Sequence, residues 1–200
     1  MKQQITTLFA GGVLALAMFG AAMAGPLEDG QAAVRHGDYA RAMQYFGVLA
    51  DQGSSVAQNN LGFMYDQGLG VPRDYAQAVV WYRKASDQGD AAAQNNLGRM
   101  YVGGQGVPRD YAQAVVWLRK AAEQRNALGQ VNLGTMYERG QGVPQDYAQA
   151  HMWYNLAASH AEDPATRETA VKNRDNVATK MTPAQIAEAQ RLASEWKPTK

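Results

Sequence analysis

Residues 54–89 read SSVAQNNLGFMYDQGLGVPRDYAQAVVWYRKASDQG, and this stretch returns twice further along the chain with most of its letters unchanged. The tripeptide Asp-Tyr-Ala within it begins at Asp74, and it also begins at Asp38, Asp110 and Asp146, at intervals of 36 residues. A period of this length is typical of solenoids, in which small supersecondary units stack on one another. The sequence therefore predicts a repeat architecture.

Each repeat reads as two helices, which we expect at about residues 55–66 and 75–88 of the first copy. Asp74 is a favourable N-cap, and Gln77 stands where the partner in a capping box belongs. Gly89 follows the second helix, where a left-handed residue commonly ends a helix. The same cap pairs recur at Asp110 with Gln113 and at Asp146 with Gln149. These signals predict an all-α solenoid of stacked helix-turn-helix units.

The turn that joins one repeat to the next has a glycine at Gly53 and Gly89 but Arg125 at the third junction. Asn126 follows that arginine, and asparagine tolerates the left-handed conformation. We therefore expect this turn to shift by one residue, onto Asn126.

Large apolar residues recur with the same period and are the predicted core. Leu61 lies one helical turn before Tyr65 on the same face, and Trp81 stands on the second helix. Gly62 lies inside a helix, where glycine costs about 1 kcal/mol relative to alanine. Its recurrence predicts that a neighbouring helix backbone approaches closely there. The equivalents in the later copies are Leu97, Gly98, Tyr101 and Trp117, then Leu133, Gly134, Tyr137 and Trp153.

The loop inside each repeat carries a G-x-G sequence, at residues 68–72, 104–108 and 140–144. No strand precedes these glycines and no third glycine follows at the spacing that a nucleotide-binding loop needs. The glycines instead fit a tight helix-to-helix turn with positive φ.

Taken together, the pattern resembles the Sel-one-like repeat (SLR) family, relatives of the tetratricopeptide repeat. The first copy carries it at Ala57, Leu61, Gly62, Tyr65, Gly68, Gly70, Val71, Pro72, Asp74, Tyr75, Ala78, Trp81 and Ala85. Copies span residues 54–89, 90–125 and 126–161, and the last has Gly129 in place of the first alanine. The resemblance implies a right-handed α-solenoid that serves as a protein-interaction scaffold and that is commonly exported in bacteria.

Three further segments complete the chain. Residues 25–53 read as a helix pair of tetratricopeptide style, and residues 162–200 as capping helices for the open end of the stack. Residues 1–24 read as a signal peptide with a short apolar core and an Ala-Met-Ala cleavage site that ends at Ala24. No cysteine follows the apolar core, so a lipid attachment point is not expected. We therefore expect a periplasmic or secreted protein.

The composition argues against most kinds of catalytic and metal site. The chain has no cysteine and 3 histidines, and its formal net charge is +1. Thiolate catalysis, cysteine zinc sites and electrostatic capture of nucleic acid are therefore not expected. His36, His151 and His160 are scattered and form no known motif. We expect no catalytic residue, no cofactor and no metal.

Positions that differ between repeats are the candidate binding residues, because architecture does not explain their variation. The predicted set combines the variable positions of the first helices with the repeated glutamine and asparagine positions that come just before the leucine. The predicted partner-binding residues are Gln58, Asn59, Asn60, Phe63, Asp66, Gln94, Asn95, Asn96, Arg99, Val131, Thr135 and Glu138. In related solenoids such helices line the concave surface, so the predicted partner is a protein or peptide held there.

Two other functions stay open at this point. The first is a cell-wall ligand binder or hydrolase with β-lactamase-like activity, as in cysteine-rich exported relatives. Those relatives carry paired cysteines in each repeat, and this chain has none. The second is a structural subunit that assembles end to end.

Overall fold

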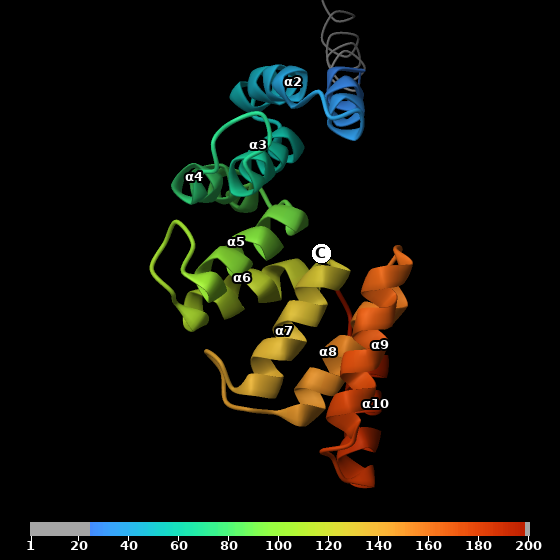
Figure 1. Cartoon of the computed structure of the whole chain (residues 1–200). Coiled ribbons are helices and arrows are strands. Elements are labelled where there is room, and N and C mark those ends of the chain that lie inside the picture. Colours follow the sequence, from blue (N-terminus) through green and yellow to red (C-terminus); the bar gives the residue numbers. More distant parts are fainter. Residues whose placement is uncertain (1–24, 199–200) are drawn as a thin grey trace, which may run out of the picture.

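A computed structural model describes residues 25–198, and within them the chain is helical with short connections and no strand. Residues 25–35 form the first helical segment. The helices that follow are α2 (Tyr39–Asp51), α3 (Ser55–Gln67), α4 (Tyr75–Asp87), α5 (Ala91–Gly103), α6 (Tyr111–Glu123), α7 (Ala127–Arg139), α8 (Tyr147–His160), α9 (Pro164–Ala178) and α10 (Pro183–Glu195). Figure 1 shows them stacked in chain order. The predicted all-α solenoid is confirmed.

Helices pack in pairs and then pair to pair. Within repeats, α3 packs on α4, α5 on α6 and α7 on α8, and each second helix also contacts the first helix of the next repeat. The first helix α5 touches the first helix α7 directly, whereas no comparable contact joins α4 to α6 or α6 to α8. Elements on the inner side of a curved stack lie closer together. The first helices α3 and α5 are joined by a hydrogen bond from Asn96 to Asn59, so we take α3, α5 and α7 as the inner face.

The aspartate N-caps form, but the capping boxes predicted beside them do not. Asp74 accepts a hydrogen bond from the backbone N–H of Gln77 at 3.0 Å. The N–H of Asp74 itself donates to the Tyr65 carbonyl at 2.9 Å, so the Gln77 side chain has no donor left to meet. Asp110 and Asp146 repeat this arrangement. The second half of each predicted box is thus replaced by a bond that closes the loop onto the preceding helix.

The prediction for the third junction was wrong. Arg125 itself adopts the left-handed conformation, with φ 64°. Asn126 has φ −67° and accepts from the N–H of Gly129 as the N-cap of α7. Ser54 and Asp90 hold the equivalent cap positions of α3 and α5. Because the cap position is fixed by the repeat, the turn must fall on the residue before it even when that residue is an arginine.

The predicted core residues are either buried or half-buried. Leu61, Leu97 and Leu133 are buried, as are Trp117 and Trp153. Trp81 and the tyrosines at positions 65, 101 and 137 are half-buried.

The glycines inside the first helices make room mainly for a large side chain of the second helix, and less for its backbone. A Cβ at Gly62 would lie 2.6 Å from the Tyr82 ring, and one at Gly98 would lie 2.7 Å from the Leu118 side chain. The nearest backbone atom at Gly98 is the Ala114 carbonyl oxygen, at 3.3 Å. The predicted close approach is therefore present, but its main cause is a side chain of the second helix that packs flat on the glycine.

The second glycine of each loop joins neighbouring repeats. Gly106 has φ +69°, and a Cβ there would lie 2.2 Å from the carbonyl oxygen of Tyr75, in the preceding repeat. Gly70 and Gly142 stand against Tyr39 and Tyr111 in the same way. The G-x-G loop is thus both a tight turn and a contact between repeats.

Two helices cover the last repeat. Both α9 and α10 pack against α8, and they lie along it in Figure 1. Trp196 meets Trp153 edge to face with ring centroids 6.0 Å apart, and Leu192 packs on the same cluster. This apolar cover is what the open end of a solenoid needs to stay soluble.

Candidate functional site

The predicted partner-binding residues all lie on α3, α5 and α7, but their exposure differs widely. Phe63 and Arg99 are exposed, and Phe63 keeps 43% of its surface. Asn59, Asn60, Asn96, Thr135 and Glu138 are half-buried. Gln58, Asp66, Gln94, Asn95 and Val131 are buried, each with 8% exposure or less. A buried side chain is not free to meet a partner, so the last group needs a structural explanation.

Buried glutamines bond the repeats together. The side-chain amide of Gln94 donates to the Ser86 carbonyl of the preceding repeat at 3.2 Å and accepts from Gln124 of its own repeat at 2.8 Å. Gln58 makes the same pair of bonds with the Ala50 carbonyl and Gln88. Gln130 is fully buried and bonds Ala122 and His160. A buried amide without partners costs about 1–3 kcal/mol. These glutamines have partners on both sides, so their role is to join neighbouring repeats rather than to bind a ligand.

Asparagines link the first helices one to the next. Asn96 donates to Asn59 at 3.1 Å, and Asn132 donates to Asn95 at 2.7 Å. Val131 occupies the position at which the next acceptor would stand. It packs in a buried cluster with Ala170 and Val177 of α9, so an apolar residue replaces the asparagine where the cap covers it.

A tyrosine on the second helix explains the variation at the end of the first helix. Tyr82 donates to the buried Asp66 at 3.4 Å, and Tyr154 donates to Glu138 at 2.9 Å. In the middle repeat both members change together, to Leu118 and Val102. An apolar residue thus stands opposite leucine and an acid stands opposite each phenol.

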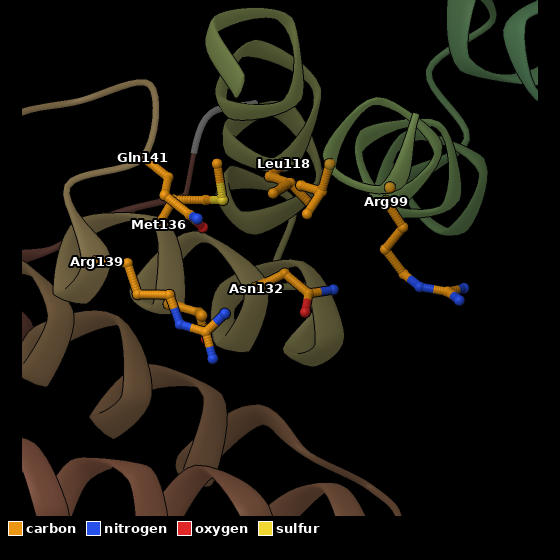
Figure 2. Close-up of a pocket in the computed structure, with 9 residues that line it drawn as sticks. Arg99, Leu118, Asn132, Met136, Arg139 and Gln141 are labelled. Atoms are coloured by element: carbon orange, nitrogen blue, oxygen red, sulfur yellow. The ribbon is translucent and has the colours of Figure 1, made fainter. Parts of the chain in front are cut away.

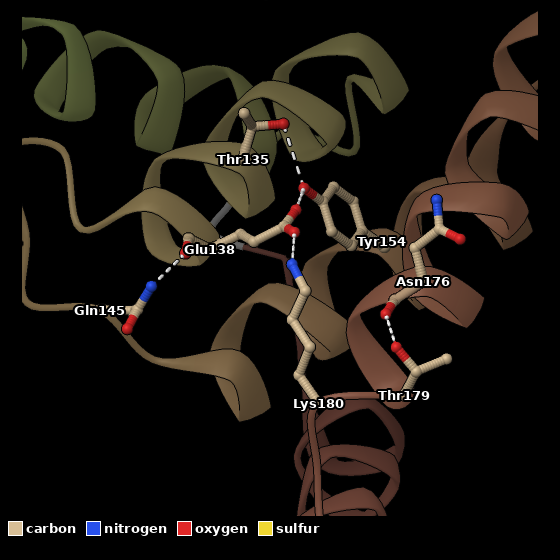
Figure 3. Close-up of polar contacts among 7 residues, drawn as sticks. All are labelled: Thr135, Glu138, Gln145, Tyr154, Asn176, Thr179 and Lys180. Carbon is tan, nitrogen blue, oxygen red and sulfur yellow. Dashed lines mark hydrogen bonds and ion pairs between the residues drawn. The ribbon is translucent and has the colours of Figure 1, made fainter.

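The network around Glu138 also reaches the cap (Figure 3). Lys180 donates to Glu138 at 2.7 Å, and Thr135 lies 3.1 Å from the Tyr154 hydroxyl. Burial by itself would raise the pKa of Glu138, but hydrogen bonds from Lys180 and Tyr154 outweigh it and leave that pKa lowered. Burial and the neighbouring acid raise the pKa of Tyr82, which therefore stays a donor. Asp66 and Glu138 therefore accept hydrogen bonds within the fold and are not available to a partner.

The leucine in the middle repeat leaves a pocket on the inner face. A cavity of about 300 Å³ lies between α5 and α7. Figure 2 shows Leu118 and Met136 in it, with Arg99 and Arg139 on either side of Asn132. At the junction before it, Tyr82 and Asp66 stand in place of Leu118 and Val102. The smaller pair lacks the phenol and carboxylate, and space is left unfilled. Its lining residues are Arg99, Val102, Gly103, Leu118, Asn132, Thr135, Met136, Arg139 and Gln141.

Of the predicted set, Arg99 and Thr135 line this pocket, while Phe63 lies one repeat earlier on the same face. The identity of Gln58, Gln94 and Gln130 across repeats already indicated an architectural role. The importance of Leu118 could have been found by comparing it with Tyr82 and Tyr154. Sequence reasoning did not place Asn132, Arg139 or Gln141 at a site.

Four stretches of the chain match the family model described as "Sel1 repeat", at residues 15–54, 55–90, 91–126 and 127–161. The chain belongs to the Sel1 repeat family. Three of the matches coincide within a residue or so with the predicted copies. The first covers the predicted tetratricopeptide-style pair at residues 25–53 and extends into residues that lie outside the described part of the chain.

Solved structures that resemble this one include two Sel1 repeat proteins. The first is c5321, a protective antigen present in uropathogenic Escherichia coli strains that displays an SLR fold, with 38% identity and a TM-score of 0.71 over 78% of this chain. The chain spans 32% of the length of that protein. The second is a Sel1 repeat protein from Oxalobacter formigenes, with 32% identity, a TM-score of 0.64, and 84% and 74% of the two chains covered. No curated protein matches the chain.

Among residues 25–198 of this Sel1 repeat protein, no helix is long and apolar enough to cross a membrane. The same residues contain no group of three or more His, Asp or Glu side chains placed to hold a metal ion. His151 and His160 lie on α8, and His36 precedes α2. They are not brought together.

The burial of His151 leads us to expect that the protein loses stability in mild acid. Its side chain is buried, and its Nδ1 has no hydrogen-bond partner within the described structure. Burial and then Arg174 lower its pKa, against a smaller opposing effect of Asp175. The unfolded state then binds a proton that the folded state resists, so stability falls as pH drops below about 6.5. We therefore expect the free energy of unfolding, measured by urea titration, to be lower at pH 5.5 than at pH 7.5.

The matched variant is His151→Val, because Val79 and Val115 hold the equivalent position in the earlier repeats. It should fold normally and show a smaller loss over the same pH range. Part of the dependence should remain, since burial also lowers the pKa of His160. An equal pH dependence in the variant and the parent would show that His151 is not its source.

Proposed function

We propose that this chain is a non-catalytic interaction module whose inner face, formed by α3, α5 and α7, binds a segment of a partner protein. Sel1 repeat proteins generally mediate protein–protein interactions. The observation that carries the proposal is the exposure of Phe63 and Arg99 at equivalent, repeat-variable positions of that face. Phe63 and Arg99 reach solvent, whereas hydrogen bonds within the chain hold several of their neighbours: Gln58, Asn59, Asp66, Gln94 and Asn96.

Export to the periplasm or the medium is part of the same proposal. Its support is the sequence of residues 1–24, with a short apolar core before Ala24. Those residues lie outside the described structure. The intact mass of protein recovered from the periplasm or the culture medium tests it, and a chain that keeps residues 1–24 in the cytoplasm would refute it.

Site-specific photo-crosslinking tests the binding face. A photoreactive phenylalanine analogue at position 63 should trap a defined companion in native cells. The matched control places the same group at Val80, which is 46% exposed on the second helix α4. The control should trap nothing or different species. Equal products from both positions would indicate random collisions rather than a binding face.

Mutation of the same residues gives the energetic test. The double variant Phe63→Ala and Arg99→Ala should weaken the trapped companion's affinity at least tenfold, about 1.4 kcal/mol, because exposed aromatic and arginine side chains are the usual hot spots. Circular dichroism should show unchanged thermal unfolding, since neither side chain is buried. An affinity that does not change would contradict the proposal.

A further inference from the structure

We infer that the cavity between α5 and α7 is a subsite for a partner peptide in which an apolar residue stands beside an acidic one. The apolar side chain would occupy the floor and the carboxylate would meet the arginines at the rim. This inference rests on the proposed function and adds the chemistry that the inner face selects.

The floor is apolar and small. Leu118 and Met136 lie beneath it with 0% and 2% of their surface exposed, so the apolar surface that a partner can reach is mainly that of half-buried Val102. A volume of about 300 Å³ is at the lower limit of small-molecule sites, so it suits one or two side chains better than a cofactor. A partner that places a leucine, methionine or phenylalanine here removes apolar surface from water.

The rim is positive, and no acid is paired with either of its arginines, although Arg139 lies near enough to Glu138 to help lower the pKa of that carboxyl. Arg99 and Arg139 are exposed, and neither forms a salt bridge with any residue of the described structure. No aspartate or glutamate lines the cavity. Glu138 precedes Arg139 in sequence, but it is held by Tyr154 and Lys180.

Arginine is suited to this role because its planar guanidinium donates two parallel hydrogen bonds to one carboxylate. Asn132 and Gln141 add amide groups to the same lining. The two arginines come from consecutive first helices, α5 and α7, and lie on either side of Asn132 in Figure 2. An extended segment that crosses these helices would therefore meet both charges.

Of the three predicted copies of 36 residues, the middle one alone carries this combination. The neighbouring copies have a tyrosine and an acid where this one has Leu118 and Val102. An acid at position 102 would place negative charge in the cavity, and a tyrosine at position 118 would fill it. The site is thus a local departure from the repeat pattern, at a position where the smaller side chains leave space open.

Selection from a displayed library of random twelve-residue peptides tests the inference on the purified chain. We expect the selected peptides to be enriched in an aspartate or glutamate next to a leucine, methionine or phenylalanine. A synthetic selected peptide should lose at least tenfold in affinity when its acid is changed to the amide. It should lose as much on the Arg99→Gln, Arg139→Gln protein, measured by fluorescence anisotropy.

Two controls separate the cavity from general charge. Arg35→Gln with Arg109→Gln removes the same two charges from exposed positions outside the cavity, and it should leave affinity unchanged. Leu118→Tyr with Val102→Asp rebuilds the Tyr82–Asp66 pair of the preceding repeat, so it should fold and should abolish binding. Circular dichroism checks that fold.

The outcomes distinguish the two proposals. Peptides without acidic enrichment, or binding that survives both cavity variants, would overturn this subsite and leave the inner face as a binding surface. A selection that enriches no peptide at all would count against peptide binding itself, and so against both.

Discussion

Replacing Gly106 by alanine should lower the free energy of unfolding by about 3 kcal/mol, the largest effect expected for a single methyl group in this protein. Alanine at φ +69° costs about 1–2 kcal/mol. The added carbon would also lie 2.2 Å from the Tyr75 carbonyl oxygen, so the two repeats must move apart. Overpacking of this kind typically costs about 1–3 kcal/mol more. Urea unfolding followed by circular dichroism measures the sum.

Two further glycines separate the causes. Gly104→Ala has φ +66°, and its nearest neighbour is the Arg109 Cβ at 3.2 Å, a tight contact but a much smaller overlap, so it should cost the conformational part and little more. Gly47→Ala lies in helix α2 with nothing within 4 Å, and it should be neutral or stabilise by up to about 1 kcal/mol. If Gly106→Ala and Gly104→Ala cost the same, the contact between repeats contributes nothing.

Removal of α10 should be the second large effect. A chain that ends at Met181 loses Leu192 and Trp196, which cover Trp153. Fully burying one large apolar side chain contributes about 1.5–3 kcal/mol. Leu192 and Trp196 are each half-buried, and their loss also exposes the buried Trp153, so we expect a loss of about 3 kcal/mol. The uncovered surface should also promote self-association, visible by light scattering.

The control for this truncation ends the chain at Trp196, which keeps the ring against Trp153 and removes only Lys197–Lys200. Its unfolding should match that of the full chain. If the Met181 truncation unfolds at the same urea concentration as this control, α10 does not act as a cap.

The architecture could be predicted because its signals are local and repeated. Leu61, Tyr65 and Trp81 recur at one interval, and the core follows from that interval and helix geometry. The docking of α9 and α10 onto α8 could not be derived in detail, because it depends on non-periodic contacts such as Trp153 with Trp196.

The binding face was predicted only in outline. Variation between repeats was interpreted as partner contact, but Asp66 and Glu138 vary because Tyr82 and Tyr154 need an acceptor. Val131 differs from Asn95 because α9 covers it. Variable positions must therefore be compared in pairs across the helical hairpin before they are assigned to a ligand. Phe63 and Arg99 remain after that comparison.

The bonds of the buried glutamines have a consequence for how such a protein can change length. Gln130 bonds the carbonyl of Ala122, and Gln94 bonds that of Ser86, the same eight positions upstream. If residues 91–126 were excised, Gln130 would meet Ser86 and Asn132 would face Asn59 without any other substitution. Duplication or loss of a whole repeat in the gene would thus preserve the hydrogen bonds between neighbouring repeats. The shortened chain would lack Leu118, so the same event that preserves the rod would erase its pocket.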